Sequence, residues 1–292
     1  MALTTRRSIF PVIGSDPRKN VFGTAFVFHR SQQPNCIYLL TCAHVIRDIE
    51  KHSKAQIYPF TTRVIAITPP EDTDDLAIIE ISKDISPEIQ LSSEQVDRAT
   101  EIFHNAEPLP LANFGKDEMS CSVYGYYEYI SRKEFKLKKL AGKLISETAV
   151  KRGIQVHVTK TWDLNFPQKI ALRHGYSGSP VIDTAKEMVV GIVRIKEDQS
   201  GQRGLAISVE AVLRLTGKLK QEHKKLRNHI HSVLRSDYGF DDLPDISHFE
   251  TANCNLLPYL ADRKAQLDQL GKIVSRHLPK SNATPIIIIL HG

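Results

Sequence analysis

Short runs of β-branched and aromatic residues, each bounded by turn residues, follow one another from residue 21 to residue 212. Many short strands with no long helix between them favour an antiparallel barrel or sandwich over a parallel α/β sheet. The chain has 292 residues, 41% of them hydrophobic, so it can bury a large core, which excludes a mainly disordered state. We therefore expect an all-β fold built from these runs: VFGTAFVFH, CIYLLT, AQIYPF, RVIAI, LAIIEI, SVYGYY, IQVHVT, MVVGIVRI and GLAISV.

The pattern changes near residue 210. Leucine, isoleucine and valine then recur at three-, four- and seven-residue spacings among lysines and arginines, which predicts an amphipathic helical arm leaving the barrel. Residues 236–255 contain glycine, proline and several aspartates, which indicates a linker. A second helical pattern over residues 259–278 precedes the apolar run 286–290, as at the start of a buried parallel strand in an α/β domain. Such a strand needs partners, so we expect it to belong to a longer protein or to dock on another chain.

Signals for export or membrane insertion are weak. The longest apolar run has five residues, whereas a membrane-spanning helix needs about 20. The segment TRRSIF at residues 5–10 resembles a twin-arginine export motif, but no apolar stretch follows it. The four cysteines are widely spaced without a CxxC pair, which favours a reducing compartment. We expect a cytoplasmic protein without a membrane partner.

Three separate segments each contain a residue type that a nucleophilic hydrolase needs. His44 follows a β-type run in LTCAHV, Asp74 and Asp75 precede the apolar run LAIIEI, and Ser177 lies in the glycine turn GYSGSPV. Serine is a weak nucleophile, so it needs a base to take its proton and a carboxylate to orient that base. Glycines on both sides of the serine let the backbone turn and aim N–H groups at one point, where an oxyanion can form.

Each of these segments also has a simpler interpretation. A histidine next to a strand is often structural, aspartates favour turns before strands, and Gly-Tyr-Ser-Gly can be an ordinary β-turn. The catalytic interpretation is favoured because all three segments occur in one chain.

The four segments GTAFVF, TCAHV, DDLAIIEI and GYSGSPV resemble, in order and context, the trypsin-like serine peptidases, and the HtrA-like variety in particular. The resemblance covers roughly residues 20–215. It implies a chymotrypsin-like fold of two six-stranded antiparallel β-barrels, about 10–112 and 113–215, within a peptidase domain at 1–217. It also implies hydrolysis of a protein or peptide substrate without a cofactor or a metal.

By this resemblance, His44 is the general base and Ser177 the nucleophile. Asp75 is the orienting carboxylate, because it directly precedes the apolar strand as in the family, and Asp74 is the alternative. The backbone N–H groups of Gly175 and Ser177 form the oxyanion hole.

The resemblance also suggests a substrate pocket. Ala171, six residues before the nucleophile, lies at its base and has no charge to attract lysine or arginine, so trypsin specificity is not expected. Arg194 and Lys196 line the other wall and would favour an acidic substrate side chain if they point inward. Strand alternation leaves the other possibility open, that they point to solvent. Tyr176 stands where secreted relatives have an aspartate that pairs with a new N-terminus, so that activation switch is absent.

Two basic clusters, residues 132–143 and 218–227, accompany a formal net charge of +6. They could bind nucleic acid, but few aromatic residues are interleaved, so a solvated loop and a solvated helix face are favoured and no nucleic acid is expected. His229 and His231 fall on different faces of a helix, so no metal site is assigned.

A second alternative to the peptidase function is a catalytically silent scaffold, in which the barrels bind a partner.

The C-terminal segments, residues 259–267 and 284–292, resemble the start of the STAND-type nucleotide-binding modules of bacterial signalling and antiphage proteins. The implied organisation is a helical linker at 218–255 and the beginning of a STAND-like α/β module at 256–292. The GxxxxGK[ST] phosphate-binding segment is not in this sequence, so nucleotide binding is not expected. The resemblance implies that the peptidase is the effector of a larger protein with a sensor module in the same chain or a partner chain.

Overall fold

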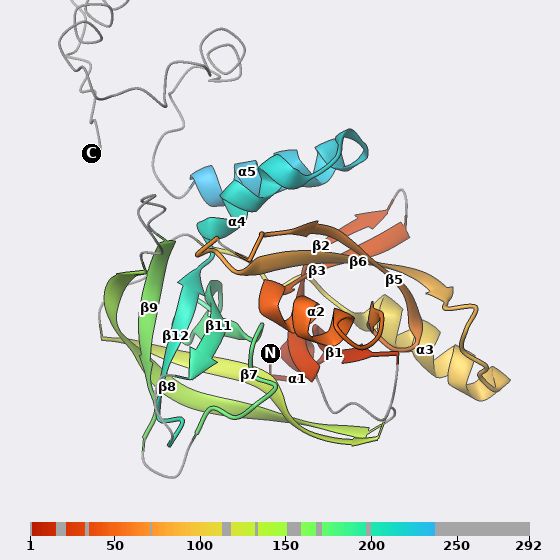
Figure 1. Cartoon of the computed structure of the whole chain (residues 1–292), viewed down its shortest axis with the longest axis horizontal. Coiled ribbons are helices and arrows are strands. Elements are labelled where there is room, and N and C mark those ends of the chain that lie inside the picture. Colours follow the sequence, from red (N-terminus) through yellow and green to blue (C-terminus); the bar gives the residue numbers. More distant parts are fainter. Residues whose placement is uncertain are drawn as a thin grey trace, which may run out of the picture. The chain divides into compact units, whose positions relative to one another are not determined.

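Two six-stranded antiparallel sheets form most of the computed structural model (Figure 1). This confirms the predicted all-β, two-barrel fold of the chymotrypsin-like class, followed by a few C-terminal helices. The structure describes residues 2–15, 22–32, 35–70, 72–112, 118–131, 134–150, 159–167, 171–196 and 200–236. In this part of the chain, no helix is both long and apolar enough to cross a membrane.

The first sheet has the strand order β4-β1-β2-β3-β6-β5. Its central strand β3 is buried along almost its whole length, because a core covers both of its faces, whereas the edge strand β5 alternates buried and exposed residues in its first half. The bounds are β1 (Ile9–Gly14), β2 (Phe22–Gln32), β3 (Asn35–Cys42), β4 (Ala55–Gln56), β5 (Phe60–Ile67) and β6 (Leu76–Ile85).

The second sheet closes into a barrel with the order β10-β11-β12-β9-β8-β7 around its own apolar core. The basic cluster at 132–143, predicted to be a solvated loop, lies mostly on the long strand β8. From residue 139 to residue 144, exposed Lys139 and Lys143 lie on the face opposite buried Leu140 and Leu144, so this part of the strand has one buried face. The bounds are β7 (Met119–Ser131), β8 (Glu134–Val150), β9 (Thr159–Asn165), β10 (Pro180–Asp183), β11 (Val189–Lys196) and β12 (Arg203–Ser208).

Helices surround the first sheet. The predicted arm beyond residue 210 is helical, but it does not leave the barrel: Leu226, Ile230 and Leu234 recur every four residues and are buried in the same core as the first sheet. Residues 218–236, predicted to be part of a linker, therefore belong to the compact unit of the barrels. The rest of the predicted linker and the STAND-like segment lie outside the described residues. The bounds are α1 (Ala2–Arg7), α2 (Ala43–Glu50), α3 (Ser93–Asn105), α4 (Ala211–Leu215), the 3-10 helices η1 (Thr216–Lys218) and η2 (Gln221–His223), and α5 (Lys224–Ser236).

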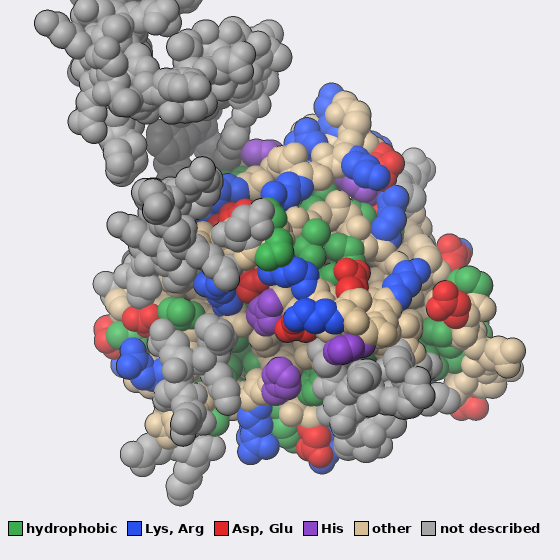
Figure 2. All heavy atoms as spheres, viewed as in Figure 1, with side chains coloured by type: hydrophobic (Ala, Val, Ile, Leu, Met, Phe, Trp, Pro, Cys, Tyr) green, Lys and Arg blue, Asp and Glu red, His purple; other side chains and the backbone are tan. Residues whose placement is uncertain are grey.

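Basic side chains are spread over the face seen in Figure 2, where acidic and uncharged groups separate them. Several basic residues of the described part of the chain also have carboxylate partners, as Arg63 has in Glu80 at 2.8 Å. This distribution favours the solvated interpretation of the basic residues over a continuous phosphate-binding surface.

Candidate active site

Strands β3 and β6 bring the predicted histidine and aspartate together. Cys42 at the end of β3 pairs with Leu76 at the start of β6, so His44 meets Asp75 although 31 positions separate them. His44 Nδ1 lies 2.6 Å from Asp75 Oδ2, and the His44 backbone N–H donates to Asp75 Oδ1 at 2.9 Å. Only 7% of the Asp75 side chain is exposed, so antiparallel register has placed a buried carboxylate against the imidazole.

The ionisation of Asp75 decides where the imidazole carries its hydrogen. Burial raises the pKa of Asp75, but the hydrogen bonds and charge of His44, with the charge of Arg194, outweigh burial and hold the pKa below its ordinary value. An ionised carboxylate can only accept, so His44 Nδ1 donates to it. In the neutral imidazole, Nε2 then has a free lone pair and can take a proton.

Asp74, the alternative carboxylate, faces a different partner. Arg214 on α4 donates to both of its oxygens, through Nε at 2.7 Å and Nη2 at 2.6 Å. Asp75 has a φ of 44°, in the left-handed region, so the backbone turns sharply between the two side chains. The structure thus brings Asp75, and not Asp74, to His44.

The turn that contains Ser177 can be built only with glycine on both sides. Gly175 and Gly178 have φ values of 99° and 88°, and a Cβ on Gly178 would lie 2.0 Å from the Thr24 carbonyl oxygen. Hydrogen bonds tie the turn to both sheets: the Thr24 N–H donates to the Ser177 carbonyl at 2.9 Å, and the Gly178 N–H to the Val193 carbonyl at 2.8 Å. The Thr24 hydroxyl also donates to the Gly175 carbonyl at 2.7 Å. Ser177 is therefore presented where the two sheets meet.

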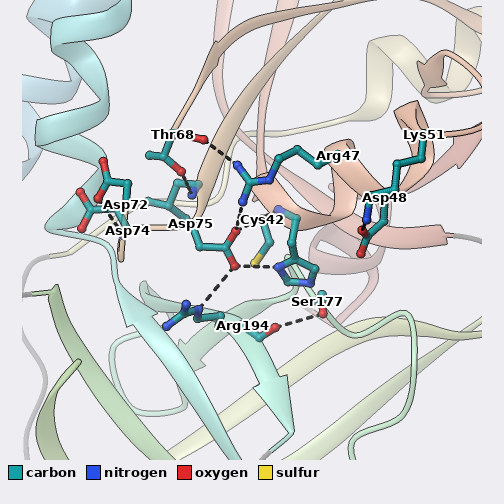
Figure 3. Close-up of polar contacts among 12 residues, drawn as sticks. Cys42, Arg47, Asp48, Lys51, Thr68, Asp72, Asp74, Asp75, Ser177 and Arg194 are labelled. Atoms are coloured by element: carbon teal, nitrogen blue, oxygen red, sulfur yellow. Dashed lines mark hydrogen bonds and ion pairs between the residues drawn. The ribbon is translucent and has the colours of Figure 1, made fainter. Parts of the chain in front are cut away.

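The Ser177 hydroxyl donates to the Arg194 carbonyl at 3.1 Å, as drawn in Figure 3. Within the described residues, no hydrogen bond joins this hydroxyl to His44. The N–H groups of Gly175 and Ser177 donate to no backbone carbonyl in the same part of the chain, whereas the intervening Tyr176 N–H donates to the Arg173 carbonyl. Two N–H groups on one glycine turn, neither bonded to a backbone carbonyl of the described residues, have the directional character that an oxyanion site needs.

Two arginines share the Asp75 carboxylate with His44 (Figure 3). Arg47 Nη2 lies 3.1 Å from Asp75 Oδ1, and Arg194 Nε lies 3.4 Å from Asp75 Oδ2. Arg47 is further anchored because its Nη1 donates to the Thr68 carbonyl at 2.7 Å. Sequence reasoning missed Arg47, although its position one helical turn after His44 on α2 was a usable signal.

Arg194 was predicted to line the substrate pocket, and the structure shows a contact of its guanidinium that the sequence did not indicate. Its guanidinium contacts Asp75, so its charge is engaged at the buried carboxylate. Ala171 is half-buried, and the side chain of Lys196 lies outside the described set. The roles predicted for Ala171 and Lys196 stay predictions.

Cys42, His44 and Asp75 form the one described cluster whose possible metal-ligating atoms all lie within 4.8 Å of one another. The Cys42 Sγ donates to the Val193 carbonyl at 3.1 Å, and burial raises the pKa of this thiol well above its ordinary value. The guanidinium groups of Arg47 and Arg194 also repel a cation from the same carboxylate. A protonated thiol beside two guanidinium groups is a poor donor set for a metal ion.

Comparisons with known proteins agree with this geometry. Residues 23–192, more than half of the chain, match the model of the family described as trypsin-like peptidase domain. A comparison with curated proteins finds no match.

Solved proteases are similar to this chain in fold. An inactive form of Rv3671c from M. tuberculosis H37Rv has a TM-score of 0.50 and 16% identity, over 75% of this chain and 89% of that one. The active form of the Rv3671c protease has a TM-score of 0.49 and 16% identity, over 75% of this chain and 83% of that one. The serine endoprotease from Yersinia pestis has a TM-score of 0.45 and 14% identity, over 74% of this chain and 65% of that one. At such identities the likeness to the first of these structures shows a shared fold alone.

Proposed function

The chain belongs to the trypsin-like peptidase domain family, and from that premise we propose that it is a serine endopeptidase with Ser177 as its nucleophile. The observation that supports this best is the 2.6 Å contact of His44 Nδ1 with the buried Asp75 carboxylate, next to a glycine turn that presents a serine hydroxyl. A histidine oriented by a carboxylate is the arrangement that makes serine nucleophilic.

In the proposed mechanism the Ser177 hydroxyl turns from the Arg194 carbonyl toward His44 Nε2 when substrate binds. His44 takes the hydroxyl proton while Oγ attacks the peptide carbonyl carbon, and Asp75 stabilises the resulting imidazolium. The tetrahedral intermediate breaks its C–N bond, and His44 gives its proton to the departing amine. Water then attacks the acyl carbon while His44 takes its proton. The bond from the acyl carbon to Ser177 Oγ breaks, and His44 returns the proton to this oxygen. In this mechanism the N–H groups of Gly175 and Ser177 donate to the oxyanion.

The test compares two serine-to-alanine variants two positions apart. Ser177→Ala removes the proposed nucleophile, whereas Ser179→Ala removes a buried hydroxyl that has no hydrogen-bond partner among the described residues. We expect a fluorophosphonate probe to label the wild type and Ser179→Ala, and to leave Ser177→Ala unlabelled. Equal circular dichroism spectra for the three proteins check that all are folded.

The labelling experiment tests one alternative function, and a nucleic-acid binding assay tests the other. A folded wild type that the probe does not label would indicate a catalytically silent scaffold. A basic nucleic-acid-binding module would instead show salt-dependent binding of DNA or RNA that weakens when the residues 218–227 are neutralised.

We also propose that the peptidase is the cytoplasmic effector of a larger bacterial signalling or antiphage protein, acting on a protein or peptide substrate under the control of a sensor module. The support is the STAND-like resemblance of residues 259–292, which lie outside the described residues. Expression of the wild type is then expected to be toxic when the sensor is triggered. Toxicity that persists in Ser177→Ala would contradict this role.

A further inference from the structure

Arg194 lies at a break in the pairing of β11 with β12. Val193 is opposite Ala206 and Ile195 is opposite Leu205, so Arg194 is an extra residue on β11 with no cross-strand partner. Such a β-bulge bends the strand and re-aims the side chain of the extra residue. At this bulge, both the guanidinium and the carbonyl of Arg194 face the proposed catalytic groups.

The two ends of Arg194 contact two different members of the site. Its Nε lies 3.4 Å from Asp75 Oδ2, the same oxygen that His44 Nδ1 contacts at 2.6 Å. Its carbonyl accepts the Ser177 hydroxyl at 3.1 Å. The side chain is 19% exposed, so this ion pair is largely shielded from water.

The charged groups in contact with Asp75 disfavour a positive charge on His44. Asp75 contributes one negative charge, and Arg47 and Arg194 contribute two positive ones. Farther from this carboxylate, Asp74 is paired with Arg214, which Asp72 and Glu210 also attract, and the Cys42 thiol is protonated. Among the groups in direct contact with Asp75, two guanidinium groups face one carboxylate, so a proton that His44 takes from Ser177 arrives beside a local excess of positive charge, and like charges at this range repel.

We propose that Arg194 is a positioning residue that restrains the site, with its guanidinium opposing the charge that His44 must acquire and its carbonyl holding the Ser177 hydroxyl away from the base. This inference rests on the proposed function. Because the ion pair with Asp75 anchors the bulge, loss of the guanidinium removes the repulsion and also frees the carbonyl to move. The restraint therefore acts through Asp75 and through Ser177 together.

The experiment measures the rate of fluorophosphonate labelling against pH, which needs no known substrate. Arg194→Met and Arg194→Gln remove the charge, and Arg194→Lys keeps it. Arg63→Met is the matched control, because it breaks an arginine–carboxylate pair at 2.8 Å between β5 and β6 of the first sheet. For the two neutral variants we expect the acid limb of the profile to move up by about one pH unit and the rate at pH 8 to rise by about 3- to 10-fold. Arg194→Lys and Arg63→Met follow the wild type.

A lower rate at every pH with an unmoved acid limb in both neutral variants would overturn the proposal, since it indicates a structural role alone. A second readout does not depend on activity. In Ser177→Ala protein, NMR follows the titration of the His44 imidazole with arginine or methionine at position 194, and the methionine form is expected to titrate at higher pH. If the wild type is not labelled by the probe, the proposed function fails, while this titration still tests the effect of Arg194. Identical titrations refute the electrostatic restraint.

Discussion

Replacement of Gly178 with alanine adds a methyl group where the structure has no room for one. The new Cβ would lie 2.0 Å from the Thr24 carbonyl oxygen, 2.4 Å from the Thr41 hydroxyl and 3.2 Å from the Cys42 backbone nitrogen. Two of these atoms belong to the backbone of β2 and β3, which cannot rotate away as a side chain can. The turn that presents Ser177 must therefore move away from the first sheet.

The cost can be worked from the contacts that this movement disturbs. Gly178 has a φ of 88°, and a left-handed backbone costs an alanine about 1–2 kcal/mol. Two hydrogen bonds tie the turn to its neighbours, from Thr24 to the Ser177 carbonyl and from Gly178 to the Val193 carbonyl. Each contributes about 0.5–1.5 kcal/mol, so the free energy of unfolding is expected to fall by about 2–5 kcal/mol in total.

Urea unfolding measures this loss, and fluorophosphonate labelling measures the displacement of Ser177. Gly217→Ala is the matched control, because a Cβ there meets no atom within 4 Å. We expect its stability to stay within about 0.5 kcal/mol of the wild type and its labelling to be unchanged. A Gly178→Ala protein with wild-type stability and wild-type labelling would refute the argument that this turn requires glycine.

Two further predictions concern the carboxylates and a histidine pair. Asp75→Asn is expected to slow fluorophosphonate labelling by about 10³-fold or more, because an amide supports the wrong imidazole tautomer, whereas Asp74→Asn keeps the rate within about 10-fold of the wild type. Equal losses in the two variants, measured side by side, contradict the assignment of Asp75. Burial and the charge of His229 lower the pKa of His29 to about 4, below its unfolded value of 6.5, so neutral His29 stabilises the fold above about pH 6.5 and this contribution is lost as the pH falls toward 4. The free energy of unfolding of the wild type should therefore fall between pH 7 and pH 5 by more than that of His29→Gln, and parallel curves for the two proteins would exclude this role.

The sequence alone was enough to find most of the strands and the three proposed catalytic residues. β3 and β6 could be predicted because both are short apolar runs, and the motifs with His44 and Asp75 lie at their ends. Ser177 could be predicted because glycines flank it, and the structure shows that neither glycine can be replaced without a steric clash. Strand β8 was missed because four lysines interrupt its apolar residues, although Leu140 and Leu144, separated by an even number of positions, can share one face of a strand.

The docking of α5 could not be predicted from its pattern. A helix with leucines at one face must cover them, but the pattern does not say which surface does so. Leu226, Ile230 and Leu234 are buried in the cluster that also contains the core of the first sheet, so the predicted arm became part of the core.

Local patterning thus determined most of the strands, and it placed a histidine after β3, an aspartate before β6 and a serine within a glycine turn. The partner of each arginine was decided only by the tertiary structure. Arg47, Arg194 and Arg214 carry the same charge, and no local rule separates them. The β3–β6 register, the bulge in β11 and the packing of α4 assign two of them to Asp75 and one to Asp74, because the strength of an ion pair depends on distances that arise only after the sheets have assembled.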